Sequence, residues 1–172
     1  MDFGFELAQG VPIHRFYVVI GPMQAQALSV TVAWLRLERA HADYARQLRR
    51  DHGITPLQLA ILSILTERPS LPLAALRKAL AIHAATIGQS IDELRRMGLC
   101  LVRPVPEDRR ARMVSITEAG RERLEQAPKA GPVRLRSASI DPARLDRLRD
   151  GLGDAIDLFG LEPWIPDQSS GR

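Results

Sequence analysis

"VRPVPEDRRARMVSIT", residues 102–117, concentrates positive charge in a short segment, with arginines at Arg109, Arg110 and Arg112. The segments "LCLVRPV" and "RMVSIT" on either side of "PEDRRA" are short and rich in apolar residues, which is typical of two paired strands. The sequence therefore predicts a small β-hairpin with a strongly basic tip. The elements expected around this hairpin indicate what such a tip can do.

Two short helices joined by a tight turn are expected just before the hairpin. The first covers Leu73–Leu80, the three-residue turn "AIH" follows, and the second covers His83–Met97 before Gly98 ends it. Two helices joined in this way are typical of a helix-turn-helix.

An apolar helix is expected before this pair, in the segment "TPLQLAILSIL". Thr55 can cap its N-terminus, Pro56 suits the first helical position and Gln58 completes a capping box. Almost no polar face is left on this helix, so we expect it at the centre of the domain. The segment "RPSLP" then ends it.

Further helices are expected on both sides of this region. The first covers Met23–Asp51, and its length and single apolar stripe favour packing against a partner helix, which a second subunit can supply. Another helix starts near Thr117 and ends by Pro128, and the last begins after the cap Asp141. The apolar stripe of the first helix is Leu28, Val32, Leu35, Ala42, Ala45 and Leu48, and that of the last is Leu145, Leu148, Leu152, Ile156 and Phe159.

The order of these elements predicts a winged helix-turn-helix, a mainly α fold with a small β-wing. In this fold the second helix of the motif lies in the major groove of DNA. If Ile87 faces the core, the side chains on the opposite face are Ala85, Thr86, Gln89, Glu93 and Arg96.

These side chains suit contacts with bases and phosphates. Gln89 can pair with adenine, Thr86 can reach a phosphate or a thymine methyl group, and Ala85 allows close approach. The alternative is that they form ordinary solvated surface. The basic hairpin favours DNA, because a narrow minor groove attracts a guanidinium carried on a stiff projection. We expect Asp108 to hold such a guanidinium by a bidentate contact, the alternative being a solvated hairpin tip.

Residues from about 23 to 127 resemble the MarR family (multiple antibiotic resistance regulators) of bacterial transcription factors. The matching segments are "ITPLQLAILSIL", "LAALRKAL", "ATIGQSIDELRRMGLCLVR" and "PEDRRARMVSITEAGRERL". The wing pattern of the family, Asp-x-Arg, apolar strand residues and then Leu-Thr-x-x-Gly, stands here as Asp108, Arg110 and "ITEAG".

The resemblance implies a homodimer built from N- and C-terminal dimerisation helices, which binds a pseudo-palindromic operator. It also implies that Arg110 enters the minor groove, that Asp108 orients Arg110, and that Arg103 contacts a phosphate. We expect Arg109 and Arg112 to contact phosphates or to support the fold of the wing.

The recognition helix departs from the family pattern. Where the family commonly has Ser-Thr-Val-Thr-Arg, this chain has Ala-Thr-Ile-Gly-Gln at 85–89. Gln89 therefore replaces an arginine, and Gly88 lowers the helix propensity by roughly 1 kcal/mol relative to alanine. His83 is a weak N-cap. We expect the operator to differ from the common one for this reason.

The composition adds weaker constraints. The chain has 172 residues, a net charge of +4 and a sequence pI of about 10.0, which only weakly favours an acidic partner. A single cysteine excludes an intrachain disulfide and favours a reducing cytoplasm. We expect no secretory signal and no membrane span.

Metal, redox and enzymatic sites are not expected. The four histidines are scattered and form no ligand pattern, so no metal or other cofactor is predicted. Cys100 begins a wing strand among apolar residues, where a structural role is favoured over redox sensing. No phosphate loop, nucleophile elbow or carboxylate pair indicates an enzyme.

We therefore predict a cytoplasmic, homodimeric transcriptional repressor that binds double-stranded DNA and is released by a small molecule. Trp34 can stack on a small aromatic or phenolic effector, although an aromatic residue at such a position is more often part of the core or of a dimer interface. The alternatives are a winged-helix protein-interaction adaptor that does not touch DNA and a nucleic-acid enzyme, for which catalytic residues are lacking. The expected division is an N-terminal arm at 1–22, a dimerisation helix at 23–52, a winged helix-turn-helix DNA-binding domain at 53–127, a linker at 128–140, a C-terminal dimerisation helix at 141–160 and a tail at 161–172.

Overall fold

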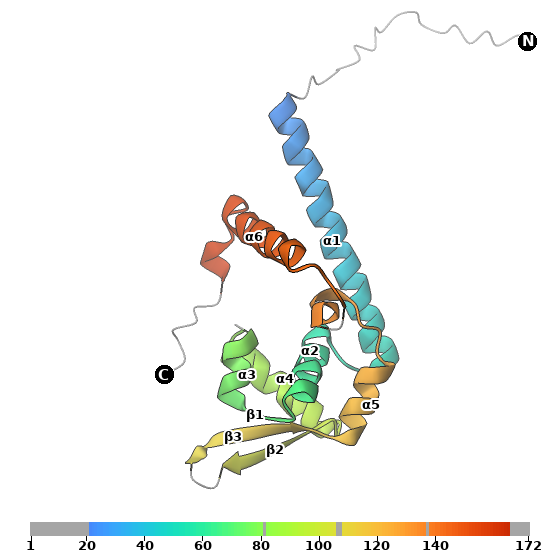
Figure 1. Cartoon of the computed structure of the whole chain (residues 1–172), viewed down its shortest axis with the longest axis vertical. Helices are drawn as coiled ribbons and strands as arrows, with labels where there is room; N and C mark the ends of the chain where they lie inside the picture. Colours follow the sequence, from blue (N-terminus) through green and yellow to red (C-terminus); the bar gives the residue numbers. More distant parts are fainter. Residues whose placement is uncertain (1–20, 81, 106–107, 137, 166–172) are drawn as a thin grey trace, which may run out of the picture. The chain divides into compact units, whose positions relative to one another are not determined.

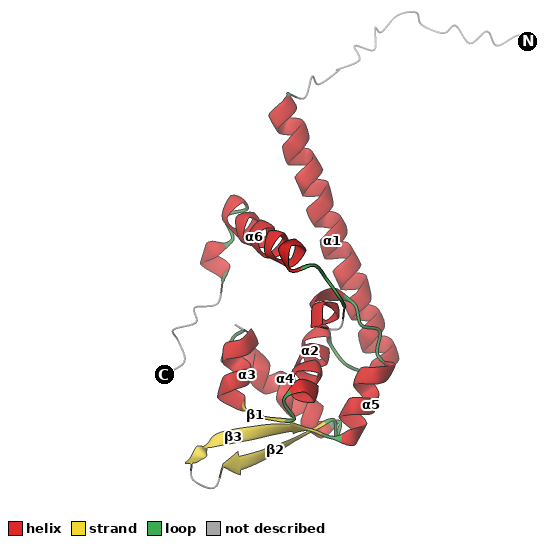
Figure 2. Cartoon of the chain, in the orientation of Figure 1, coloured by secondary structure: helices red, strands yellow, loops and turns green. Residues whose placement is uncertain are grey.

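The computed structural model describes residues 21–80, 82–105, 108–136 and 138–165, with the backbone alone described at 84 and at 108–110. The chain divides into two compact units, residues 1–39 and residues 40–172. Of the predicted arm at 1–22, only residues 21 and 22 are among the described residues. Figure 1 labels the elements, and Figure 2 shows that helices predominate.

The described part of the first unit is helical. It forms the beginning of α1 (Pro22–His52), and the unit boundary falls inside this helix. Every residue from 22 to 39 is exposed, including the apolar side chains of Leu28, Val32 and Leu35. The first half of the predicted apolar stripe is thus exposed, whereas Leu48 in its second half is fully buried.

The second unit holds the remainder of α1 and all the other elements (Figure 1). In chain order they are α2 (Pro56–Glu67), β1 (Ser70–Pro72), α3 (Leu73–Leu80), α4 (Ala84–Arg96), β2 (Cys100–Val105), β3 (Asp108–Ile116), α5 (Glu118–Gln126), the 3-10 helix η1 (Gly131–Arg136), α6 (Pro142–Leu158) and the 3-10 helix η2 (Glu162–Trp164). The helix-turn-helix is α3 and α4, and the order of elements is that of the predicted winged helix-turn-helix.

The wing is a three-stranded antiparallel sheet in the order β1-β3-β2, not the two-stranded ribbon that we predicted. The missed strand is β1, where Leu71 pairs with Val114. The sequence shows only a helix-breaking "RPSLP" here, because three residues are too few for an alternating pattern. Pro72 is tolerated because β1 is an edge strand.

The strand β3 also begins earlier than predicted. Residues 108–111 were expected in the loop "PEDRRA", whereas β3 starts at Asp108, which pairs with Val105 of β2. The ladder with β2 extends the strand through this polar stretch, with an irregularity between Pro104 and Val105. The arginines of the quoted segment therefore belong to a strand.

The helix α2 is the centre of the core, as predicted. Its capping box is confirmed: the hydroxyl of Thr55 accepts from the Gln58 backbone N–H at 3.2 Å, and the Gln58 side chain accepts from the Thr55 N–H at 2.8 Å. It packs against α4, α5 and β3. The fully buried side chains of this core include Leu48, Ile54, Leu59, Ile61, Leu62, Leu65, Leu76, Ile87, Leu94 and Val114.

A compact junction joins α4, β2 and α5. Gly98 ends the helix with a φ of +71°, a conformation that favours glycine. The Thr117 hydroxyl donates to the Gly98 carbonyl at 2.7 Å and accepts from the Gly120 N–H at 3.1 Å, so it caps α5. These bonds hold the wing at a defined position relative to the recognition helix.

The segment predicted as a linker contains structure. The 3-10 helix η1 lies against α2, and its Val133 is buried. The apolar side chain of Val133 lets η1 pack on α2. The sequence did not indicate this packing, because the residues around Val133 are mostly polar, proline or glycine. The cap of the last helix is confirmed, since the Asp141 carboxylate accepts from the Ala143 N–H at 3.1 Å. The short helix η2 lies in the stretch predicted as a loose tail.

Candidate nucleic-acid interface

The recognition helix α4 has the orientation that the sequence predicts. Ile87 and Leu94 are fully buried and Ile91 is nearly so. The opposite face is exposed, and it carries Ala85, Thr86, Gln89 and Arg96. Of these, Ala85, Gln89 and Arg96 follow each other at intervals of four and seven residues, which places them on one line along the helix. The structure thus brings together four of the predicted DNA-binding residues.

Glu93 does not belong to this exposed face, although we predicted that it would. Its carboxylate accepts a hydrogen bond from the side-chain amide of Gln58 at 2.5 Å, and the residue is half-buried. Gln58 is fully buried and its amide needs a partner there, because an unsatisfied buried polar group is costly. Glu93 therefore ties α4 to the start of α2.

Asp92 lies on the exposed face and was missed. It stands seven residues after Ala85 and three after Gln89, so the spacing alone could have found it. Its carboxylate lies 3.6 Å from the Arg95 guanidinium, and both side chains are largely exposed. A carboxylate on this face repels phosphate but can accept from cytosine, so it restricts which contacts the helix can make.

The N-terminus of α4 is weakly held. His83 makes no side-chain hydrogen bond to the helix, in agreement with the prediction of a weak cap. Gly88 has no heavy atom within 4 Å of the position that a Cβ would occupy. No packing within the described residues thus requires a glycine at this position.

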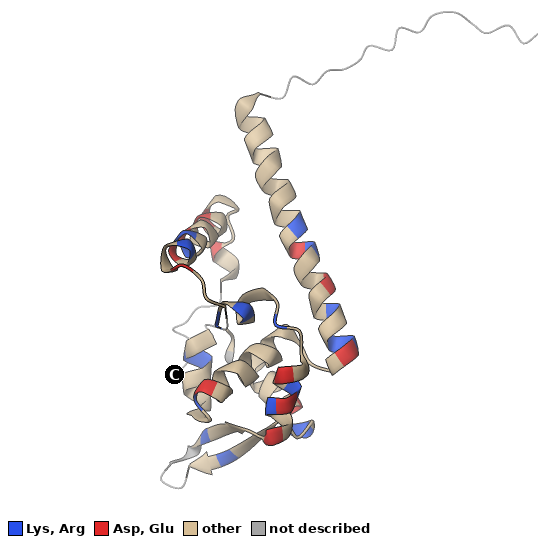
Figure 3. Ribbon diagram, turned by 45° about the vertical axis from the view of Figure 1, so that its right-hand side comes forward, with Lys and Arg blue, Asp and Glu red and all other residues tan. Residues whose placement is uncertain are grey.

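On the wing, Arg103 and Arg112 are exposed but lie on opposite faces of the sheet. Arg103 pairs with Met113, whereas Arg112 pairs with Pro104 and is two residues from the buried Val114. Directly opposed residues share a face and successive residues alternate, so the two guanidiniums leave the sheet on different sides. Figure 3 shows basic positions on these two strands. Arg112 also donates to the carbonyl of Ala111 at 3.3 Å.

The side chains of Asp108, Arg109 and Arg110 lie outside the described residues. Their backbone forms the first part of β3. The predicted contact between Asp108 and Arg110 therefore stays a prediction.

Comparisons with known proteins agree with this architecture. The sequence model of the MarR family matches residues 54–111, from just before α2 into β3. A probable transcriptional regulator from Pseudomonas aeruginosa, known as a crystal structure, is 30% identical; the match covers 71% of this chain and 95% of that one, with a TM-score of 0.52. The chain belongs to the MarR family.

Two further relatives of this MarR-family chain indicate its role. The transcriptional regulator MhqR of Bacillus subtilis is 26% identical over 98 residues, which are 57% of this chain and 68% of MhqR. The structure of Bordetella bronchiseptica BpsR, whose DNA binding is regulated by 6-hydroxynicotinic acid, is 26% identical with a TM-score of 0.54; the match covers 74% of this chain and 98% of that one. The protein is thus a transcriptional regulator of the MarR family and not an enzyme.

Cys100 is buried at the start of β2, as predicted for a structural cysteine in this MarR-family protein. Burial raises the pKa of its thiol to about 11, and the thiol lies 3.7 Å from the carbonyl oxygen of Ile91. A thiol of this kind carries little thiolate at neutral pH and reacts slowly.

The remaining predicted sites are less constrained. Trp34 lies on α1 in the first unit with 39% of its surface exposed, and its effector role stays a prediction. Within the described ranges, no three histidine, cysteine or acidic side chains lie close enough to hold a metal ion. The described helices include none with the length and apolar character needed to cross a bilayer.

Proposed function

We propose that this MarR-family regulator is a homodimeric repressor that binds a pseudo-palindromic operator in double-stranded DNA. Each subunit places α4 in a major groove and the wing at the adjacent minor groove. The observation that supports this most is the division of α4 into a buried apolar face and an exposed face with Ala85, Gln89 and Arg96.

The exposed residues have different roles in this proposal. Ala85, Thr86 and Gln89 read base edges, and Gln89 favours adenine because its amide both donates and accepts. Arg110, oriented by Asp108, enters the minor groove. The phosphate contacts come from Arg96, Arg103, Arg109 and Arg112, which position the protein without reading sequence.

The homodimer is supported by exposed apolar side chains on the two terminal helices. In α1 these include Leu28 and Leu35, and in α6 they include Leu148 and Leu152, each between 47% and 54% exposed. Two helices with such stripes suit a partner helix from a second copy. Light scattering on the full chain should give twice the mass of one chain, and Leu148→Glu with Leu152→Glu should lower it.

Release by a small aromatic or phenolic effector completes the proposal. It is supported by BpsR, whose DNA binding responds to 6-hydroxynicotinic acid. An effector acts if it binds better to a conformation that does not fit the operator. Stacking on Trp34 is one way to hold such a ring.

Nuclease protection of the DNA upstream of the gene for this protein tests the proposal. We expect two protected half-sites about one helical turn apart. Arg110→Ala should weaken operator binding by about 1–3 kcal/mol, whereas Arg144→Ala on α6, which removes the same charge, should not. Failure to bind any duplex at low salt would reject the proposal in favour of the protein-interaction adaptor, because phosphate contacts are strongest there.

A further inference from the structure

The recognition helix α4 is held against the core by two kinds of interaction. Ile87, Ile91 and Leu94 bury an apolar stripe. This burial keeps the helix on the core, but it is non-directional and does not fix how far the helix is rotated about its own axis. A hydrogen bond is directional, so it can fix that rotation. Such a bond joins the Gln58 side chain of α2 to the Glu93 side chain of α4.

The capping box decides which way the Gln58 amide faces. Its oxygen accepts from the Thr55 backbone N–H at 2.8 Å, so its nitrogen is the atom that serves α4. That nitrogen donates to a carboxylate oxygen of Glu93 at 2.5 Å. Because Gln58 is fully buried, residue 93 has to supply an acceptor, or the amide is left unsatisfied. The start of α2 thus determines which side chain suits position 93.

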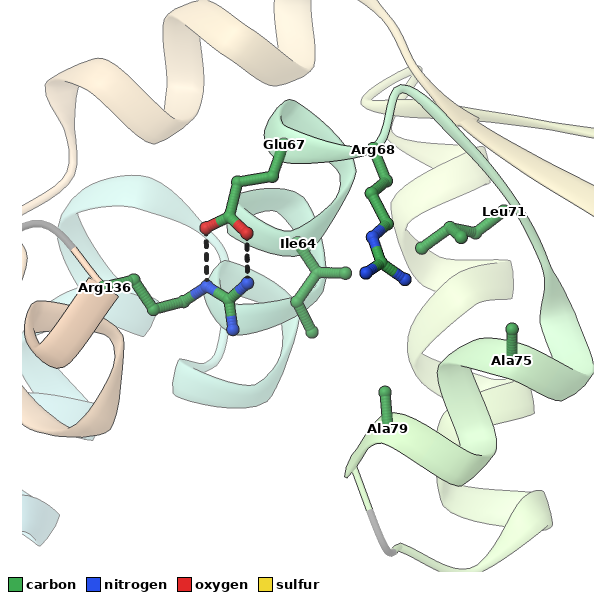
Figure 4. Close-up of a pocket in the computed structure, with 7 residues that line it drawn as sticks. All are labelled: Ile64, Glu67, Arg68, Leu71, Ala75, Ala79 and Arg136. Atoms are coloured by element: carbon green, nitrogen blue, oxygen red, sulfur yellow. Dashed lines mark hydrogen bonds and ion pairs between the residues drawn. The ribbon is translucent and has the colours of Figure 1, made fainter. Parts of the chain in front are cut away.

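Helix α2 is a fixed reference for this bond. At its other end, the Nε of Arg136 donates to one carboxylate oxygen of Glu67 at 2.8 Å, and the Nη2 donates to the other (Figure 4). These hydrogen bonds lower the pKa of Glu67 and raise that of Arg136, so both side chains stay charged. Between the two ends, Leu59 and Leu65 are fully buried. A change in the Glu93 bond should therefore move α4 and not α2.

Glu93 lies beside the side chains proposed to read DNA. It follows Thr86 by seven residues and Gln89 by four. At about 3.6 residues per turn, its direction differs from that of Thr86 by roughly 20° and from that of Gln89 by roughly 40°. A rotation that the Glu93 bond prevents would carry both side chains round with the helix. Hydrogen bonds to base edges would then be lost, because their donor–acceptor distances span only about 0.5 Å.

We infer that Glu93 is a positioning residue for DNA recognition. Through its bond to Gln58 it sets the rotation of α4, and with it the contacts that Thr86 and Gln89 make with bases. Loss of the bond should weaken binding to the operator more than binding to unrelated DNA, because phosphate contacts such as that of Arg103 carry no sequence information. This inference rests on the proposed DNA-binding function.

A set of variants separates the bond from the charge. Glu93→Leu removes the acceptor, whereas Glu93→Gln removes the same charge and keeps an acceptor. Glu93→Asp keeps the charge but shortens the side chain by one methylene group, so that the helix has to rotate or lose the bond. Gln58→Glu sets two carboxylates against each other, although glutamate still suits the capping box.

The exchanged pair, Gln58→Glu with Glu93→Gln, is the matched control. It restores the bond with donor and acceptor exchanged, and it has the net charge of the unaltered chain. The capping box is kept as well, since a glutamate oxygen can accept from the Thr55 N–H. Far-UV circular dichroism checks that each variant is folded.

The measured quantity is the ratio of the affinity for the operator to the affinity for an unrelated duplex of the same length, at one salt concentration. Glu93→Leu, Glu93→Asp and Gln58→Glu should each lower this ratio about tenfold, the order of effect of losing one base contact. Glu93→Gln and the exchanged pair should keep it. The slope of log affinity against log salt concentration should not change, because the phosphate contacts remain. If Glu93 only stabilised the fold, both affinities would fall by the same factor and the ratio would not move.

Three results would overturn the inference. The first is an unchanged ratio in Glu93→Leu, or in Glu93→Asp if the leucine variant does not fold. The second is an exchanged pair whose ratio is no higher than that of Gln58→Glu. The third is an exchanged pair that does not fold, because both of its hydrogen bonds are available.

The same measurements distinguish this inference from the proposed function. A chain that binds no duplex loses the proposed function, and the inference with it. A chain that prefers its operator, and keeps that preference in the folded Glu93 variants, retains the proposed function and loses the inference alone. Hydrogen exchange of the α4 backbone amides, measured without DNA, should be faster in Glu93→Leu than in Glu93→Gln, and equal rates would also count against the bond as the support of the helix.

Discussion

Replacing Gly120 by alanine should destabilise the protein, although alanine is the better helix former. Gly120 lies in α5, and a Cβ there would stand 2.2 Å from the backbone oxygen of Leu99 and 2.9 Å from a side-chain carbon of Ile116. Since real Cβ contacts essentially never fall under 3.0 Å, the helix and the Leu99 carbonyl must separate by about 0.8 Å. Neither atom belongs to a flexible side-chain end.

The size of the effect follows from three contributions. Overpacking of a close contact costs about 1–3 kcal/mol. The same carbonyl accepts from the Thr117 N–H at 3.2 Å, and losing this bond costs about 0.5–1.5 kcal/mol. The higher helix propensity of alanine offsets up to about 1 kcal/mol of this cost. Gly120→Ala should therefore lower the free energy of unfolding by about 0.5–4.5 kcal/mol.

Urea denaturation followed by circular dichroism measures this effect, and Gly88→Ala is the matched control. Gly88 is also a helix glycine, but nothing lies within 4 Å of its Cβ position, so alanine there should raise the free energy of unfolding by up to about 1 kcal/mol. The reasoning is refuted if Gly120→Ala unfolds at the same or a higher urea concentration than the unaltered chain.

Three other predictions follow from the geometry. Cys100 should react with iodoacetamide at pH 8 roughly 100 times more slowly in the native chain than in urea, because its pKa is about 11; equal rates would contradict its burial. The pKa of Glu67 is lowered in the folded state, so its contribution to the free energy of unfolding should be present above the usual pKa and be lost as the pH falls through the folded value. Glu67→Gln should reduce this loss of stability at acid pH, and an unchanged loss would count against the ion pair with Arg136. Arg103→Gln and Arg112→Gln should each weaken operator binding by about the same factor for all DNA sequences, and should reduce the slope of log affinity against log salt concentration by about 1. A change in sequence preference would show base contacts instead.

Local chemistry accounts for what the sequence predicted well. The capping box of Thr55 and Gln58, the cap at Asp141 and the helix-ending Gly98 are formed by neighbours in the chain, so their residue types suffice to place them. The buried face of α4 follows from the 3.6-residue period, which needs no knowledge of what covers it. The family resemblance rests on these same segments, and it was confirmed.

Contacts between distant segments account for what the sequence did not show. The strand β1 exists only because Leu71 meets Val114, and Glu93 turns inward only because the buried Gln58 needs a partner. In the same way, Glu67 and Arg136 are 69 residues apart in the chain, yet their side chains form a bidentate ion pair. The sequence by itself determined the α-helices, the caps at Thr55 and Asp141 and the buried side of the recognition helix, because those depend on neighbours. The tertiary structure alone decided the third strand, the partner of Glu93 and the pairing of Glu67 with Arg136, because each depends on which surfaces meet after folding.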